Sequence, residues 1–155
     1  MKRSIGATAT ILLFAFAGVA NAQPSGSETI TTTLLFPSFP SSAPFVGTYS
    51  GTFSASGMVT DTGTVTDQAL FGGVPSPVTG VLQQVRTLVG SHGTLTLRCA
   101  QRVPPGQSSS VVSNTGSCVV LGATGAYSGL RGSGSLTGTT DFGATPVTVQ
   151  DTLVL

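Results

Sequence analysis

The residue best suited to acid and base catalysis, His92, is the only histidine of the 155-residue chain and follows Ser91 in the segment Gly-Ser-His-Gly. A serine nucleophile needs a histidine that is itself oriented by a carboxylate, and adjacency in sequence does not supply that geometry. The chain also lacks the Gly-x-Ser-x-Gly sequence of a nucleophile elbow. The aspartates are scattered and have no metal-ligand spacing to His92. We therefore interpret His92 as an exposed turn residue, predict no metal site, and leave the catalytic residues unassigned.

The aspartates offer a second kind of chemistry, because a strand aspartate that points into a barrel has a raised pKa and can act as an acid or a base. Asp67 and Asp151 fall within predicted strands. Asp61 falls in a predicted turn, residues 61–63, and Asp141 ends a strand. The face that Asp151 shares by alternation is apolar and consists of Val147, Val149, Leu153 and Leu155. We predict that Asp151 is a polar group in a cavity, with a position at the rim or a pair with an arginine as the alternatives.

The N-terminus has the three zones of a secretory signal. Two cations precede an apolar run, residues 11–19, and the small-x-small cleavage site Ala20-Asn21-Ala22. A membrane-spanning anchor needs about 20 apolar residues, and this run is shorter. The sequence therefore predicts that residues 1–22 are a signal peptide, that no stable membrane anchor remains after cleavage, and that the protein is exported to the periplasm or the extracellular medium.

The remaining residues, 23–155, are enough for one domain with its own core. They contain no lysine, and four arginines against five carboxylates give a net charge of −1. The charged residues are Arg86, Arg98, Arg102, Arg131, Glu28, Asp61, Asp67, Asp141 and Asp151. Phosphate-backbone binding depends on clustered cations. The composition therefore predicts no nucleic-acid partner.

Cys99 and Cys118 are the only cysteines. An exported chain meets oxidising conditions, in which an even number of cysteines usually pairs. The two lie on strand-like segments on either side of one loop, so they come opposite each other if those segments pair antiparallel. Two thiols are too few for a structural zinc site, and their spacing is not that of a Cys-x-x-Cys redox motif. We predict a structural disulfide that closes a ring of about 20 residues and stabilises the fold by roughly 3 kcal/mol.

Eight strand-like segments, separated by Gly, Pro, Asn and Asp, follow one another along residues 23–155, and helix is at most a minor component. The segments are 28–36, 45–59, 64–70, 80–89, 94–103, 111–121, 130–141 and 147–155. Between residues 48 and 57, aromatic, small or apolar residues alternate with Ser and Thr. That alternation predicts one packed face and one hydrated face.

The last predicted strand is apolar and would leave an exposed sheet edge unless another strand covers it. Closing the sheet on itself removes both edges. We therefore predict that residues 23–155 form a single all-β domain, an eight-stranded antiparallel β-barrel, with a two-sheet sandwich of the same strands as the alternative.

A glycine-rich segment, residues 121–132, reads Leu-Gly-Ala-Thr-Gly-Ala-Tyr-Ser-Gly-Leu-Arg-Gly. These 12 residues resemble the Gly-Gly-Thr-Gly-x-Phe-x-x-Ala-Arg-Gly signature of dirigent proteins, whose eight-stranded barrel is shared with allene oxide cyclase. Ala123, Tyr127 and Leu130 replace the second glycine, the aromatic residue and the alanine of that signature. The resemblance implies an exported barrel whose apolar cavity steers a reactive small molecule without a cofactor.

The same residues also have a purely structural interpretation. Gly122 and Gly125 suit positive φ in a strand connection, and Tyr127 can pack over the turn. A phosphate-binding loop would need a lysine and a following helix, so nucleotide binding is not expected. Arg131 heads a predicted strand, where it either pairs with a carboxylate such as Asp141 or contacts a ligand.

Two functions of different classes fit these features. The first is binding of a small hydrophobic molecule inside the barrel, extended by dirigent- or cyclase-like steering of a reaction, with Arg131, Asp151 and Tyr127 as ligand-binding residues. The second is a non-enzymatic structural or interaction protein of the cell envelope or medium that meets a partner through its Ser/Thr face. An interior filled entirely by Phe, Leu and Val would exclude the first, and a large outward apolar patch would favour the second. Neither function requires a particular oligomeric state.

Overall fold

The computed structural model of the chain describes residues 27–37, 45–72, 81–102 and 109–155. The predicted signal peptide lies outside the described residues. The strands are β1 (Glu28–Phe36), β2 (Phe45–Gly57), β3 (Asp61–Gly72), β4 (Val81–Gly90), β5 (Thr94–Arg102), β6 (Val111–Ala123), β7 (Ser133–Asp141) and β8 (Val147–Val154). A short 3-10 helix, η1 (Gly125–Gly129), lies between β6 and β7. No helix of these described ranges is long and apolar enough to cross a membrane.

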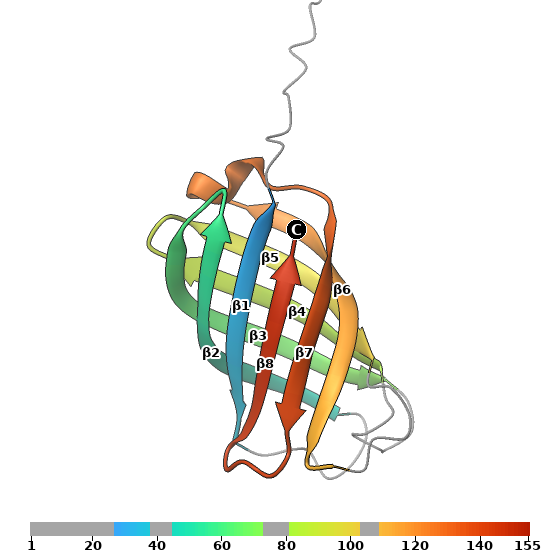
Figure 1. Cartoon of the computed structure of the whole chain (residues 1–155). Helices are drawn as coiled ribbons and strands as arrows, with labels where there is room; N and C mark the ends of the chain where they lie inside the picture. The colour runs from blue at the N-terminus through green and yellow to red at the C-terminus, as the bar shows by residue number, and fades with distance from the viewer. Residues whose placement is uncertain (1–26, 38–44, 73–80, 103–108) are drawn as a thin grey trace, which may run out of the picture.

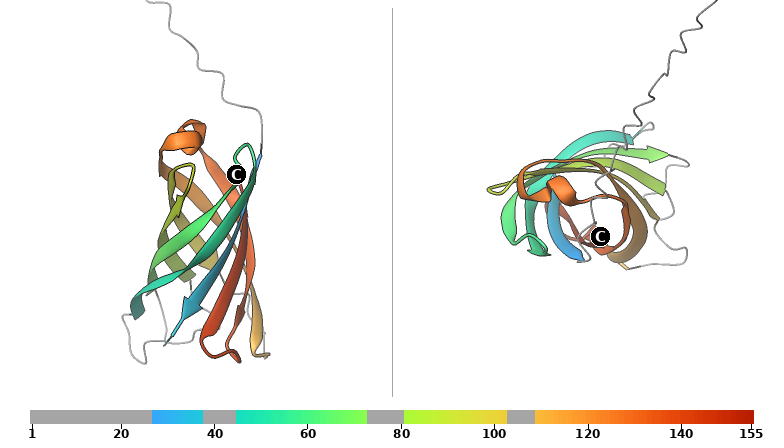
Figure 2. Two further views of the ribbon diagram at one scale, coloured as in Figure 1. Left: turned by 90° about the vertical axis from the view of Figure 1, so that its left-hand side faces the viewer. Right: turned by 90° about the horizontal axis from the view of Figure 1, so that it is seen from above.

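The eight strands form one closed barrel (Figure 1). Each strand pairs antiparallel with the next strand along the chain, and β8 pairs with β1. The view along the barrel in Figure 2 shows the strands as a ring. The predicted eight-stranded antiparallel barrel is therefore confirmed. The alternative sandwich is not formed, because β1 has hydrogen-bonded neighbours on both sides and the sheet has no edge.

Alternation along each strand decides which side chains enter the barrel. In β2, Tyr49, Phe53 and Ala55 are buried, whereas the Ser and Thr residues between them are exposed. This confirms the predicted packed and hydrated faces of this segment. Thr suits such an outer face because its branched side chain favours extended backbone while its hydroxyl group remains hydrated.

Two predictions about turns are wrong. Residues 61–63 open β3 instead of forming a turn, and Asp61 is buried. The chain reverses just before them, after Gly57, whose φ of 129° is unfavourable for other residues. Gly122 does not take a positive φ either, because β6 continues through it, whereas Gly125 at 59° does.

The apolar core lies on both sides of a layer of polar residues. One part is near the end of the barrel that η1 covers, here called the η1 end, and it includes Ile30, Phe53, Val65, Leu88, Leu95, Leu97, Leu136 and Leu153. The other part is nearer the opposite end, where β1, β3 and β5 finish, here called the loop end. It includes Leu34, Phe36, Tyr49, Ala69 and Val149. The rings of Phe36 and Tyr49 stack there with centroids 3.7 Å apart.

The predicted disulfide between Cys99 and Cys118 is confirmed. The two residues are direct partners in the register of β5 and β6, with Cα atoms 4.0 Å apart. Both side chains point into the barrel and are buried. The disulfide therefore forms part of the interior, next to the polar layer.

Candidate functional site

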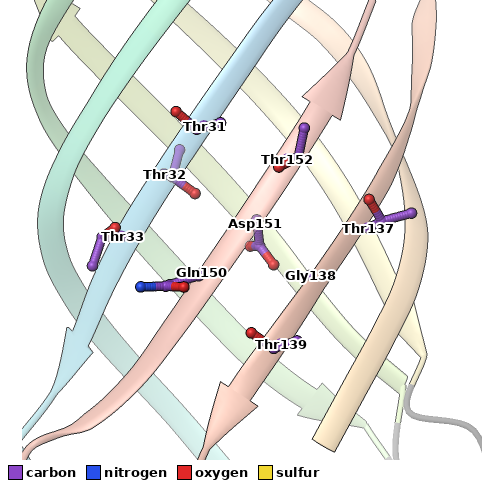
Figure 3. A pocket seen from close by; sticks show the side chains of 9 residues that line it. All are labelled: Thr31, Thr32, Thr33, Thr137, Gly138, Thr139, Gln150, Asp151 and Thr152. Carbon is purple, nitrogen blue, oxygen red and sulfur yellow. The ribbon is translucent and has the colours of Figure 1, made fainter.

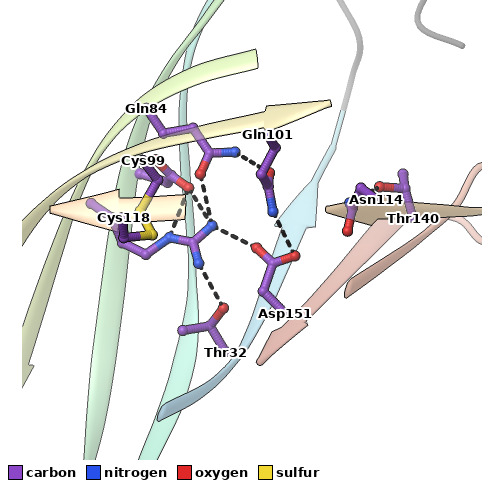
Figure 4. A network of polar contacts seen from close by, with 10 residues as sticks. Thr32, Gln84, Cys99, Gln101, Asn114, Cys118, Thr140 and Asp151 are labelled. Carbon is purple, nitrogen blue, oxygen red and sulfur yellow. Dashed lines mark hydrogen bonds and ion pairs between the residues drawn. A yellow bond between two sulfur atoms is a disulfide. The ribbon is translucent and has the colours of Figure 1, made fainter. Parts of the chain in front are cut away.

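A buried arginine, Arg86 of β4, is at the centre of the polar layer, and its side chain is only 1% exposed. Its Nε and Nη2 donate to Asp67 Oδ2 at 3.1 and 2.9 Å. Nη2 also donates to Asp151 Oδ2 at 2.7 Å, and Nη1 donates to Thr32 Oγ1 at 3.1 Å (Figure 4). Asp67 lies on the neighbouring strand β3, whereas Asp151 and Thr32 come from β8 and β1 on another part of the wall. Arg86 therefore ties distant strands together through the interior.

Two glutamines close a ring of hydrogen bonds around this ion pair. Gln84 accepts from Arg86 Nη2 at 2.9 Å and donates through Nε2 to Gln101 Oε1 at 2.6 Å. Gln101 then donates to Asp151 Oδ1 at 2.8 Å. Both glutamines are buried. The ring fixes the orientation of the Asp151 carboxylate, since each of its oxygens accepts from a different donor.

The polar layer combines one guanidinium group, that of Arg86, with two buried carboxyl groups, those of Asp67 and Asp151. Burial raises the pKa of Asp67, and this effect exceeds the lowering by Arg86. Burial works to lower the pKa of Arg86, but the two carboxylates together hold that pKa above its usual value. Arg86 therefore stays charged, and the raised pKa of Asp67 suits this carboxyl to take up and release a proton.

Two acceptor oxygens of this part of the interior lack a hydrogen-bond partner. Asp67 Oδ1 is one, and Asn114 Oδ1 of β6 is the other. Asn114 is buried and donates through Nδ2 to Thr140 Oγ1 at 3.3 Å, which leaves its oxygen unpaired. An unpaired buried acceptor costs roughly 1–3 kcal/mol. Such atoms need a proton, a water molecule or a ligand as a partner.

Because Gly138 of β7 has no side chain, these polar groups can pack against the inner face of the barrel at this position. It lies between Asn114 and Asp151 in the register of the three neighbouring strands. A Cβ atom on residue 138 would collide with Asp151 Oδ1 and with the backbone oxygen of Gln150, and it would lie 2.7 Å from Asn114 Oδ1. The oxygens of Asn114 and Asp151 therefore lie close together beside Gly138, where a side chain on residue 138 would not fit.

The structure does not bring Arg131 and Asp151 together, although the sequence-based site requires it. Arg131 is exposed near the η1 end and donates through Nη1 to the backbone oxygen of Leu130 at 2.6 Å. Asp151 is buried, as its apolar face predicts, but its arginine partner is Arg86. The joint site of Arg131 and Asp151 is thus corrected to one of Arg86 and Asp151. A ligand-binding role for each residue stays a prediction.

Tyr127 belongs to a separate polar cluster beneath η1. Its side chain is fully buried and donates to Asp61 Oδ2 at 3.2 Å. Burial raises the pKa of Tyr127, and the charge of Asp61 adds to that rise. Burial would also raise the pKa of Asp61, but hydrogen bonds from Ser91, His92 and the backbone of Thr62 hold it well below its ordinary value.

Ser91, His92 and Asp61 lie together but are not arranged as a catalytic triad. Ser91 Oγ is 3.0 Å from His92 Nδ1, and Asp61 Oδ1 is 3.2 Å from the same nitrogen. In a triad the serine and the carboxylate contact opposite ring nitrogens. Asp61 also accepts from the backbone N–H groups of Ser91 and His92. The cluster therefore holds the β4–β5 turn, and the His92 side chain is exposed as predicted.

Sequence reasoning missed Arg86 as a site residue. In β4 the residues that alternate with Arg86 include Leu82 and Leu88, but the opposite face carries three valines and looks more apolar. The signal that could have identified Arg86 was electrostatic. Asp67 and Asp151 were predicted to lie in strands, and two interior carboxylates need a cation. Arg86 is the arginine that lies directly opposite Asp67 in the sheet.

A shallow groove of about 540 Å³ runs over the outside of β1, β8 and β7 (Figure 3). Its outward lining consists of Thr31, Thr33, Thr137, Thr139, Thr152 and Gln150. None of these side chains is charged. The groove is thus a hydroxyl-rich surface, and Asp151 and Gly138 lie at its floor, with Asp151 turned toward the interior.

Comparisons with models of protein families, with curated proteins and with solved structures find no match to this chain. Within the described residues, no three His, Cys, Asp or Glu side chains are grouped so that they could hold a metal ion. The assignment of a function therefore depends on the geometry of the two polar sites, the interior layer and the outer groove.

Proposed function

We propose that the protein binds a small hydrophobic molecule whose polar end contacts the layer of Arg86, Asp67 and Asp151. The observation that carries this proposal is the buried cluster itself. Apolar residues of similar volume are often as stabilising as a buried ion pair, or more so. Departures from an apolar core are expected at functional sites. A layer with an excess carboxylate and unpaired acceptors is such a departure.

The apolar part of the ligand would lie between the polar layer and the loop end. Phe36, Tyr49, Leu34 and Val149 line the interior on that side, together with the small side chain of Ala69. Tyr49 is the direct partner of Asp67 in the register of β2 and β3. A ligand there would contact aromatic carbon and a carboxyl at the same time.

Steering of a reaction without a cofactor is part of this proposal, and the raised pKa of Asp67 supports it because this carboxyl can transfer a proton. The segment that resembles dirigent proteins forms the end of β6, η1 and the residues that lead to β7. It supports the barrel rather than the residues of the polar layer. Export to the periplasm or medium is also proposed, and the disulfide supports it because disulfides persist in oxidising compartments.

The test is a thermal-shift screen of the purified protein against hydrophobic small molecules, since a ligand that binds only the folded state raises its apparent stability. A ligand of the interior should lose most of its shift in Asp151→Asn, which keeps the shape of the side chain but removes its charge. Asp141→Asn, at a residue at the end of β7 outside the layer, is the matched control and should respond like the unmodified protein. A panel without any binder, or a binder that responds equally in Asp151→Asn, contradicts the proposal.

A second candidate function is binding of a neutral, hydroxyl-rich partner such as a glycan by the outer wall, as expected for a non-enzymatic interaction protein. Strand register aligns two transverse rows of polar, uncharged side chains across β3, β2, β1, β8, β7 and β6. The rows are Thr64, Thr52, Thr33, Gln150, Thr139 and Ser113, and Thr62, Ser54, Thr31, Thr152, Thr137 and Thr115. The outer groove lies in the middle of both rows.

Retention on insoluble neutral polysaccharides tests this alternative. Thr152→Lys places a long charged side chain in the groove and should abolish retention. Val85→Lys adds the same charge on β4, at an exposed residue outside both rows, and should leave retention unchanged. Equal retention of the two variants would exclude the groove as the binding surface.

A further inference from the structure

The side-chain atoms of the polar layer that lack a hydrogen-bond partner are acceptors and not donors. Each of the three guanidinium nitrogens of Arg86 already donates to a residue of the layer, namely Thr32, Asp67, Gln84 or Asp151. The two side-chain atoms that lack a partner, Asp67 Oδ1 and Asn114 Oδ1, are both acceptors. Although it contains an arginine, the layer is therefore not suited to receive a carboxylate or phosphate.

The charge of the layer favours the same kind of occupant as its hydrogen bonds. One guanidinium faces two carboxylates, so the layer has an excess of one negative charge when Asp67 and Asp151 are both ionised. A buried excess charge is costly unless it is neutralised. A proton on Asp67 would neutralise it, and the raised pKa of this carboxyl favours that proton. A cationic group on a ligand could replace that proton.

Asn114 adds an observation that is independent of the acidic residues. It is 4% exposed, comes from β6, and directs its unpaired oxygen to the place beside Gly138 that Asp151 Oδ1 also faces. A donor at that place would contact Asn114 and Asp151 together. An ammonium group has three donors and no acceptor, so it matches a place at which only oxygens converge.

An aromatic surface lies beside the acceptors. Tyr49 is paired in register with Asp67, and its ring stacks on that of Phe36. Burial raises the pKa of Tyr49, and the charge of Asp67 raises it further, so the phenol stays neutral. Aromatic faces attract cations, and the attraction strengthens when the cation is removed from water.

We propose that the interior site takes small aromatic or apolar amines, with the ammonium group among the oxygens of Asp67, Asp151 and Asn114 and the apolar part toward Phe36 and Tyr49. This inference rests on the proposed function and names its ligand class. The neutral alcohol of the same shape provides one donor and leaves the excess charge in place. The corresponding carboxylate adds a further negative charge to a layer whose unpaired side-chain atoms are acceptors.

Three probes of nearly equal shape test the inference: phenethylamine, phenethyl alcohol and hydrocinnamate. Their affinities for the purified protein are measured by isothermal titration calorimetry at about pH 7, where the amine is protonated and hydrocinnamate is ionised. Charge-assisted hydrogen bonds should make the amine bind about tenfold or more tightly than the alcohol. Hydrocinnamate should show no binding.

Asp67→Asn should reduce the affinity for phenethylamine to that for the alcohol. Asp141→Asn is the matched control, because Asp141 lies at the end of β7 outside the layer and accepts from the backbone N–H of Gly143. It should bind the amine as the unmodified protein does. Should Asp67→Asn not fold, the chemical shift of the Asp67 carboxyl carbon in the unmodified protein gives a second measurement, and it should change more on titration with the amine than with the alcohol.

The possible failures separate the inference from the proposed function. Tighter binding of the alcohol or of hydrocinnamate would overturn the amine inference while leaving a small-molecule barrel intact. Amine binding that Asp67→Asn does not weaken, or a carboxyl shift that does not respond, would also overturn it. The absence of binding by all three probes overturns the inference, and the proposed function fails with it only if the broader hydrophobic panel contains no binder either.

Discussion

Arg86 shows how a single residue can be essential to a fold without being the best choice for its stability. Among the residues that the structure describes, it is the one cation that contacts Asp67 and Asp151, and the ring through Gln84 and Gln101 depends on it. Removing one partner of a buried ion pair leaves a charge without compensation. Replacing the whole cluster by apolar residues leaves no buried charge. The two kinds of substitution therefore distinguish a structural cluster from a functional one.

Arg86→Met should lower the free energy of unfolding by about 3–5 kcal/mol, because it leaves two buried carboxylates without a cation. The triple variant Arg86→Met, Asp67→Leu and Asp151→Leu should regain most of that stability. Denaturant unfolding measures both. Arg98→Met, at an exposed residue of β5, is the control and should change stability by no more than about 0.5 kcal/mol. A triple variant no more stable than the single one would indicate that the cluster serves mainly the fold.

Gly138→Ala should destabilise the barrel by about 1–3 kcal/mol, since the added carbon collides with the backbone oxygen of Gln150 as well as with Asp151. Gly122 of β6 is the matched control. An added Cβ there has nothing within 4 Å, and its φ is not positive. Gly122→Ala should therefore be neutral or slightly stabilising. Equal melting temperatures for the two variants would contradict the packing described around Gly138.

At the scale of the elements, β4 shows a strand whose hydrophobic pattern does not predict which side chains face the interior. Most strands could be located from alternation and from their Gly and Pro boundaries, and β1 has the expected limits. In β4 the valines on the outer face compete with the leucines on the inner face, so periodicity alone would turn Arg86 outward. The inner face is decided by pairing with β3 and β5, which is a tertiary effect. The candidate site was therefore only half predictable: Asp151 follows from its apolar neighbours, whereas Arg86 follows from register.

The pairing of β5 with β6 was predictable because Cys99 and Cys118 lie on strand-like segments on either side of one loop. Replacing both by alanine should lower the free energy of unfolding by roughly 3 kcal/mol, since the disulfide restricts the unfolded chain. Denaturant unfolding measures the change, and reductant should produce a similar loss in the unmodified protein. The intact mass should also be lower by two hydrogens than that of the reduced chain. Two thiols that react with an alkylating agent in unfolded, non-reduced protein would contradict the disulfide.

The whole molecule separates its charges between interior and surface. Four of its carboxylates, Glu28, Asp61, Asp67 and Asp151, are buried with Arg86. The charged residues that are not buried, among the described ranges, are Arg98, Arg102, Arg131 and Asp141. The outer wall is therefore hydrated by Ser and Thr hydroxyls instead of ions, and the interior holds the groups that titrate. The response of this barrel to pH should consequently come from inside it.

The stability of the protein should be greatest in mildly acidic solution. Burial raises the pKa of Glu28 and that of Asp67 in the folded state. Such groups favour the fold most below their unfolded pKa of about 4, and this contribution is lost as the pH rises through their raised values. Asp61 acts in the opposite sense, because its hydrogen bonds lower its pKa and its contribution is lost as the pH falls below about 4.

Urea unfolding should therefore give a higher free energy at about pH 5 than at about pH 7.5, and Asp67→Asn or Glu28→Gln should reduce that difference. Asp141→Asn, outside both buried clusters, should leave the pH profile unchanged. Stability that rises steadily from about pH 5 to pH 8 would show that these carboxyls are ionised in the folded barrel at no cost.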